Sequence, residues 1–185
     1  MRHVSQPRGI RQIILIWATL VCGLLSLQGQ SPGEYQVKAA YLYSFGKFVS
    51  WPAENSDAFL LCILGDDPFG PALEHTISNT TLNGKPVAAK RISSAQDASG
   101  CRIVFVASSE SRFLARDLAS LPMGVLTVSD IENFSQSGGM IQFVNDNSRI
   151  RFEVNLTAAQ GSGLHLSSEL LKVATRVKGA PQNSR

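Results

Sequence analysis

The chain has 185 residues and carries 17 basic against 14 acidic side chains. Three of the basic ones, Arg2, Arg8 and Arg11, stand near the N-terminus, where no acidic residue occurs. The rest of the chain is therefore neutral, which argues against nucleic-acid binding, because such proteins present a basic face. Its length of about 155 residues suits a single domain with a sizeable core.

Residues 1–29 have the pattern of a secretory signal peptide. A basic flank is followed by about seventeen mostly apolar residues and then by small polar ones. We expect cleavage near Gly29, with Gln28 as the second candidate. The alternative is a retained N-terminal anchor, because an apolar stretch of this length nearly spans a bilayer.

Residues 34–52 predict a helix rich in aromatic side chains, which Pro52 ends. The predicted core-facing stripe consists of Val37, Ala40, Tyr41, Ser44, Phe45, Phe48 and Val49. Lys38 and Lys47 fall outside this stripe. A helix packed on the core is the simplest interpretation. The alternative is that aromatic side chains offer a surface to a partner; the candidates are Tyr43, Phe45 and Trp51.

The stretch FLLCILG is typical of a strand buried on both faces. Asp67 suits an N-cap and Pro68 the first position of the helix expected after it. Asp66 and Asp67 also follow the carboxyl end of the strand, where open α/β sheets bind ligands. A ligand loop formed by Asp66, Asp67 and Phe69 is therefore the alternative to capping. Catalysis by the aspartate pair is less favoured, because capping accounts for Asp67.

Further strands and helices alternate along the middle of the chain. Strands are predicted over residues 85–92, 101–109 and 124–130, and helices over residues 110–122 and 131–137. In the first of these helices Phe113 belongs to the apolar side and Asp117 does not.

The pattern then changes to two alternating runs around residues 145–148, which predict a hairpin with one buried and one wet face. A short helical segment is expected from Thr157, and a closing helix over residues 164–177, capped by Ser167 or Ser168. Residues 180–185 are predicted to form a disordered tail.

These elements predict one domain over residues 33–179. Short strands that alternate with helices and end in a hairpin are typical of a mixed α/β sandwich. We expect a largely parallel sheet with a C-terminal antiparallel hairpin and flanking helices.

Cys62 and Cys101 are the cysteines that remain after the leader. Export takes them to an oxidising compartment, where such a pair usually forms a disulfide. The bridge would close a loop of about 40 residues and add about 4 kcal/mol of stability. Two buried free thiols are the alternative. A structural staple is favoured over a redox-sensitive lock, because structural bridges in exported proteins resist reduction.

Motifs of catalysis or metal binding are absent from the sequence, including the serine nucleophile elbow, the zinc-protease helix and the phosphate loop. His75 and His165 alone do not suffice for a metal site. Gly138 and Gly139 precede a strand and not a helix N-terminus, so they favour a turn over a phosphate site. We expect a protein that is not an enzyme and binds no metal or cofactor.

Seven blocks of the sequence resemble, in order and spacing, the YfiR-like family of exported bacterial proteins. They are VKAAYLYSFGKFVSWP, CILGDDPFG, LNGKPV, GCRIVFVASSE, GVLTVSDIENFSQSGGMIQFV, RIRFEVNLTAA and LHLSSELLKVA, and the resemblance covers about residues 35–178. The resemblance implies a small α/β sandwich that acts in the periplasm. Its founding member represses a membrane-bound diguanylate cyclase by binding the periplasmic part of that enzyme, which lowers cyclic di-GMP and limits biofilm.

The resemblance extends to the cysteines. Cys62 and Cys101 match the family's widely spaced pair, whereas the chain lacks the second pair that some members carry late in the sequence. A redox switch that depends on the second pair is therefore not expected. The resemblance also allows for a homodimer.

Competing functions follow from these observations. The first is a periplasmic regulator that binds and represses a membrane-bound signalling enzyme, with a diguanylate cyclase as the expected partner. The alternatives are a small-ligand sensor module that uses the loop after the first buried strand, and an accessory protein of a membrane sensor kinase. A hydrolase that uses the aspartate pair is the least favoured.

Overall fold

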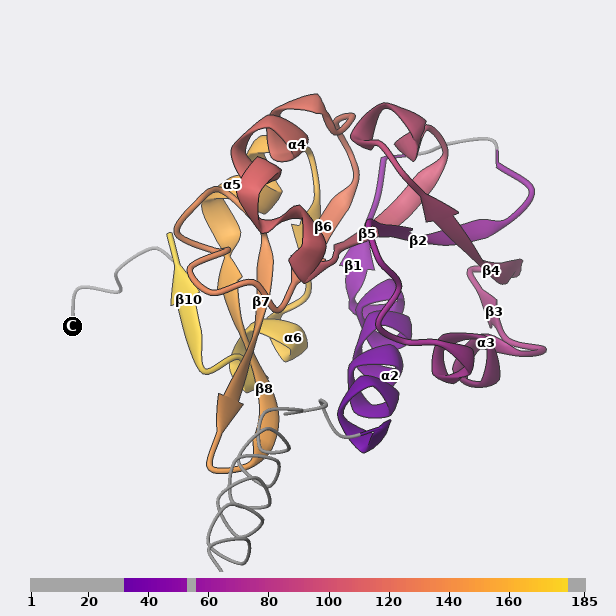
Figure 1. Ribbon diagram of the computed structural model, residues 1–185, viewed down its shortest axis with the longest axis horizontal. Coiled ribbons are helices and arrows are strands. Elements are labelled where there is room, and N and C mark those ends of the chain that lie inside the picture. Colours follow the sequence, from indigo (N-terminus) through magenta and orange to yellow (C-terminus); the bar gives the residue numbers. More distant parts are fainter. Residues whose placement is uncertain (1–31, 53–55, 180–185) are drawn as a thin grey trace, which may run out of the picture. The chain divides into compact units, whose positions relative to one another are not determined.

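The computed structural model describes residues 32–52 and 56–179 (Figure 1). The predicted signal peptide (residues 1–29) and tail (residues 180–185) lie outside these residues. The described part is a single mixed α/β domain built on an eight-stranded, largely parallel sheet. This arrangement confirms the predicted fold class.

The sheet has the strand order β10-β8-β7-β6-β5-β2-β4-β3. Its strands are β2 (Phe59–Leu64), β3 (Thr81–Leu82), β4 (Lys85–Ile92), β5 (Cys101–Val106), β6 (Leu126–Ser129), β7 (Ile141–Asp146), β8 (Arg149–Asn155) and β10 (Arg176–Lys178). Two further strands, β1 (Val49–Ser50) and β9 (His165–Leu166), form a separate antiparallel pair.

Strands β4, β2, β5, β6 and β7 run parallel to one another. From β2 the chain passes to β4 on one side and then returns to β5 on the other side. The direction of winding therefore reverses between β2 and β5, and in open α/β sheets such a switch point is where ligands usually bind.

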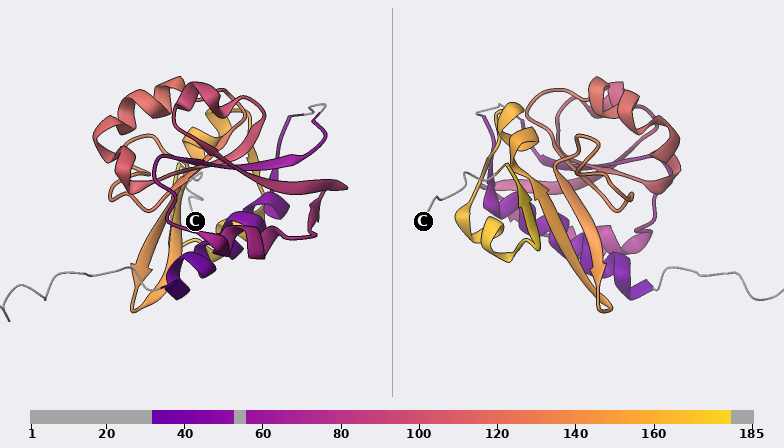
Figure 2. Two further views of the ribbon diagram at one scale, coloured as in Figure 1. Left: turned by 45° about the vertical axis from the view of Figure 1, so that its right-hand side comes forward. Right: turned by 90° about the vertical axis from the view of Figure 1, so that its left-hand side faces the viewer.

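Helices cover both faces of the sheet (Figure 2). The larger core lies on the face covered by α2 (Pro32–Phe48), α3 (Pro71–Ile77), α5 (Leu156–Gly161) and α6 (Ser168–Val173). A smaller core on the other face involves α4 (Leu114–Ser120) and the 3-10 helix η1 (Ala95–Ala98). A second 3-10 helix, η2 (Ser108–Phe113), leads into α4.

The C-terminal hairpin agrees with its prediction. Strands β7 and β8 pair antiparallel and are joined by Asn147 and Ser148, which both have positive φ. A two-residue turn of this kind matches the twist of the strands it connects. Phe143, Phe152 and Val154 face the core, whereas Arg149 and Arg151 are exposed.

Some predicted elements differ from the structure. Helix α3 begins at Pro71 after Gly70, because Asp67 does not cap it but turns the chain, its Oδ1 accepting the Phe69 N–H at 2.8 Å. Residues 131–137 form turns and not a helix. Residues 110–122 begin as a 3-10 helix and leave Phe113 exposed and Asp117 buried, the reverse of the prediction.

The closing helix is also shorter than predicted. Helix α6 ends at Val173, and Arg176–Lys178 becomes the edge strand β10. The backbone N–H of Thr175 donates to the Phe152 carbonyl at 2.9 Å. The residues after α6 therefore form hydrogen bonds with the free edge of β8, which they could not form as part of a longer helix. Ser167 is the cap, since its Oγ accepts the Leu170 N–H.

Helix α2 faces the core differently from its prediction. Val37 and Phe48 of the predicted stripe are exposed, whereas Tyr35, Ala39 and Leu42 are buried. Both sides of this helix carry apolar residues, so spacing alone could not tell which side packs.

Lys38 is buried and ties α2 to the carboxyl end of β6. Its Nζ lies 2.6 Å from Asp130 Oδ2 and 2.5 Å from Glu34 Oε1. The Tyr35 hydroxyl donates to the same Asp130 oxygen at 2.8 Å. Because Lys38 is only 2% exposed, these carboxylates replace water as the partners of its charge.

We expect the variant Lys38→Met to lower the free energy of unfolding by about 3 to 5 kcal/mol, because it leaves the Asp130 carboxylate without its cation. Chemical denaturation measures this loss. The exposed Lys47 of the same helix is the matched control, and Lys47→Met should change stability by less than about 0.5 kcal/mol. Equal stabilities of the two variants would contradict the assigned role of Lys38.

The predicted disulfide is present: Cys62 and Cys101 are bonded, with a Cα–Cα distance of 5.9 Å and a sequence separation of 39. It joins β2 to the neighbouring strand β5 across the switch point, on the face of the smaller core. Both cysteines are buried.

Reduction of this bridge should lower the free energy of unfolding by about 2 to 4 kcal/mol, because the unfolded chain loses its cross-link. Denaturation with and without a thiol reductant measures the effect, and the double variant Cys62→Ala, Cys101→Ala should not respond to the reductant. Free thiols at both positions in a non-reducing peptide map would overturn the assignment.

Candidate functional site

The loop after β2 lies at the switch point, where the sequence placed a ligand loop. Phe69 is buried and packs edge-on against Phe105 and Tyr35, with ring centroids 4.8 and 5.2 Å apart. It therefore cannot reach a ligand in this conformation. Asp66 is exposed, and its backbone N–H donates to Ser109 Oγ at 3.0 Å.

Asp67 is engaged in an ion-pair network that joins α3 to β4. Arg91 donates to Asp67 Oδ2 from Nε at 2.8 Å and from Nη2 at 2.5 Å, and it also pairs with Glu74 of α3. The hydrogen bond to Glu74, together with that to Asp67, raises the pKa of Arg91 above its usual value. The aspartate pair is therefore split: Asp67 serves the fold, and only Asp66 faces solvent.

The aromatic candidates for a partner surface do not form one surface. Phe45 is fully buried between Phe143 and Phe152 of the hairpin, with its ring centroid 5.1 Å from that of Phe152, so it cannot meet a partner. Tyr43 is half-buried beneath the Lys47 ammonium group. Trp51 is half-buried against Phe59 and donates from its indole nitrogen to the Arg102 carbonyl at 3.2 Å.

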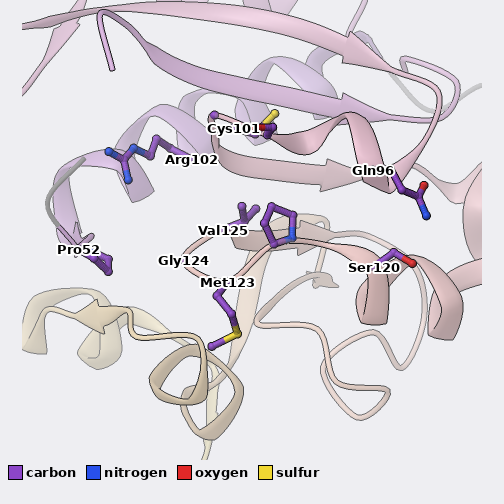
Figure 3. A pocket seen from close by; sticks show the side chains of 11 residues that line it. Pro52, Gln96, Cys101, Arg102, Ser120, Met123, Gly124 and Val125 are labelled. Atoms are coloured by element: carbon purple, nitrogen blue, oxygen red, sulfur yellow. The ribbon is translucent and has the colours of Figure 1, made fainter. Parts of the chain in front are cut away.

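A hollow of about 560 Å³ opens at the opposite, amino-terminal edge of the sheet (Figure 3). One wall comes from the start of β5, with Cys101 and Arg102, and the other from the turn before β6, with Met123. In Figure 3 Arg102 extends toward Pro52, and Met123 stands on the opposite rim. This hollow could not be predicted from the sequence, because turn residues carry no periodicity.

The chemistry of this hollow suits binding. Its lining residues offer a guanidinium group, hydroxyls, an amide and a thioether: Arg102, Ser99, Ser120, Gln96 and Met123. The described residues of this lining include no carboxylate and no histidine. Its volume falls within the range of ligand pockets.

Residues 32–52 and 56–179 lack the features of two other kinds of site. No helix there is long and apolar enough to cross a membrane. No group of three or more histidine, cysteine and acidic side chains there could hold a metal ion.

The ion pair on α3 predicts a pH effect. The hydrogen bond from Arg91 holds the pKa of Glu74 below 4.5, so its stabilisation is complete above that value and is lost as the pH falls through the lower folded-state pKa. The Glu74 side chain is 47% exposed, so solvent screening limits the effect to less than about 1 kcal/mol.

We therefore expect Glu74→Gln to be less stable than the wild type at pH 7 and nearly equal to it at about pH 3. Urea denaturation at both pH values measures the difference. Glu132, exposed on the loop after β6, is the matched control. If the stability of Glu74→Gln and that of Glu132→Gln changed with pH in the same way, the Arg91–Glu74 ion pair would not be the cause.

Solved structures share the architecture described above. The chain is similar to a conserved domain protein from Vibrio cholerae, with a TM-score of 0.52 and 8% identity, covering 78% of this chain and 60% of that one. It is also similar to an ABC domain in complex with L-Trp from Streptococcus pneumonia, with a TM-score of 0.50 and 13% identity, covering 77% of this chain and 60% of that one. At these identities the likeness concerns the fold alone.

No curated protein matches the chain. Comparison with protein families, however, matches residues 35–175 to the YfiR/HmsC-like family. This match agrees with the blocks noted in the sequence and spans the strands and helices from α2 to α6. Because the match covers most of its length, the chain belongs to the YfiR/HmsC-like family.

Proposed function

We propose that the protein represses a membrane-bound diguanylate cyclase by binding the periplasmic part of that enzyme. Membership of the YfiR/HmsC-like family carries this proposal, because it supports a periplasmic regulator of cyclic di-GMP signalling in general. The identity of the enzyme and the sign of the regulation are our own inference.

Two features of the structure support a binding protein that works outside the cytoplasm. The Cys62–Cys101 bridge suits an oxidising compartment. The hollow beside it is lined by polar and apolar groups that suit binding. Its Arg102 and Met123 are residue types that are enriched in protein interfaces.

Repression requires a difference in affinity between two states of the cyclase. A protein that binds both states equally well shifts nothing, however tightly it binds. If the active and inactive states were equally populated, holding 99% of the enzyme inactive would need about 100-fold tighter binding to the inactive state, or about 2.7 kcal/mol.

A small-ligand sensor is the second candidate, and the hollow of about 560 Å³ favours it. The two functions are compatible, since a ligand that changes the affinity for the partner would couple them. An accessory role toward a membrane sensor kinase predicts instead that cyclic di-GMP is unaffected by the protein.

Deletion of the gene should raise intracellular cyclic di-GMP, because the cyclase loses its repressor. Mass spectrometry of cell extracts measures the nucleotide, and a restored copy should return it to the original level. A copy that lacks residues 1–31 is the matched control and should not restore repression, since it would remain in the cytoplasm. An unchanged cyclic di-GMP level across several growth conditions would contradict the repressor function.

A further inference from the structure

Three hollows adjoin one another along a single edge of the domain. The hollow of about 560 Å³ shares Pro52 and Arg102 with a neighbour of about 180 Å³ on one side. It shares Pro122, Met123 and Val125 with another of about 180 Å³ on the other side. Because neighbouring hollows share lining residues, the three lie in one row along this edge, and we call this row the amino-edge groove.

The amino-edge groove follows the starts of five parallel strands. The residues that begin or directly precede these strands line it, in the spatial order Lys85, Phe59, Cys101, Val125 and Met140. Neighbouring strands lie about 4.8 Å apart, so five strands span about 19 Å. An extended peptide of about six residues has the same length.

The two ends of the amino-edge groove differ in chemistry. Near β6 and β7 most lining side chains are apolar, Thr127 and Ser162 being the polar ones, and Met123 stands there 74% exposed. Near β2 and β4 the lining includes the cations Arg102 and Lys85. Among the described residues that line the three hollows there is no acidic side chain.

We propose that the amino-edge groove binds an extended segment of the partner protein. The segment places an apolar side chain against Met123 and a carboxylate near Arg102 and Lys85. This inference rests on the proposed function and names the surface that performs it. Methionine suits such a contact because its flexible thioether adapts to the shape of an incoming side chain.

The geometry favours this occupant over others. A single small molecule fills one hollow and leaves the remaining two open. A second copy of the chain would bring the cationic ends of two grooves together, and the described lining residues hold no acidic side chain to match them. Arg102 and Lys85 also make interactions within the chain, so a carboxylate from the segment adds to these.

The amino-edge groove lies away from the positions that the sequence offered for contacts. Asp66 is at the carboxyl edge, and Tyr43 is on α2. Only Trp51 among the aromatic candidates lines the groove, at its cationic end. The proposed binding site is therefore distinct from the ligand loop expected at the switch point.

A library of random twelve-residue peptides displayed on phage tests the inference with purified protein. The enriched peptides should combine an apolar residue with an aspartate or glutamate several residues away. Binding of a synthetic copy should weaken at least about tenfold in Met123→Asp and in Lys85→Gln, as for central interface contacts. Phe113→Asp places the same new charge on an exposed apolar position outside the groove and should leave binding unchanged.

Thermal unfolding of each variant and the peptide-induced shifts of backbone amides complete the test. Shifts should concentrate in residues 99–102 and 121–125. The inference is overturned if no peptide is enriched, if Met123→Asp binds as tightly as the wild type, or if the shifts map elsewhere.

The same variants separate this inference from the proposed function in cells. If deletion raises cyclic di-GMP but Met123→Asp and Lys85→Gln restore repression completely, the groove is not the partner site and the repressor function stands. If deletion leaves cyclic di-GMP unchanged, the repressor function fails. The peptide experiment then still decides whether the groove binds an extended segment.

Discussion

A buried ammonium group must be paired, and this requirement determines how α2 sits on the sheet. Lys38 Nζ reaches Glu34 within its own helix and Asp130 at the end of β6. The pairing turns inward a face of the helix that differs from the expected stripe, so that Val37 and Phe48 of the stripe are exposed. With Lys38 turned inward, Phe45 enters the aromatic cluster of the hairpin, and the position of α2 over both halves of the sheet follows.

The same ion pair lies at the carboxyl edge of the sheet, where doubly wound proteins usually bind ligands. Asp130 forms an ion pair with Lys38, and Asp67 forms one with Arg91. The ring of Phe69 packs against that of Phe105. Two of the carboxylates at the carboxyl ends of the strands are thus used by the fold, whereas Asp66 stays exposed. The described hollows open at the amino ends instead, where residues of η1, α4 and α5 contribute to their walls.

Local chemistry explains which features could be predicted. The hairpin followed from alternation and from turn residues that tolerate positive φ, and the bridge followed from two cysteines in buried strands. The orientation of α2 could not be predicted, because it depends on Asp130, which lies 92 residues after Lys38. The groove is formed by residues at the starts of five strands, which come together only in the folded sheet. Its position therefore cannot be predicted from any single stretch of the sequence.

The single bridge also simplifies the way the protein acquires its covalent structure. Cys62 and Cys101 are the only cysteines among the described residues, so oxidation within this part of the chain has one outcome. No mispaired intermediate has to be rearranged by thiol–disulfide exchange. For the described residues, an oxidant is enough to form the disulfide. A disulfide isomerase has no mispaired bond to rearrange there.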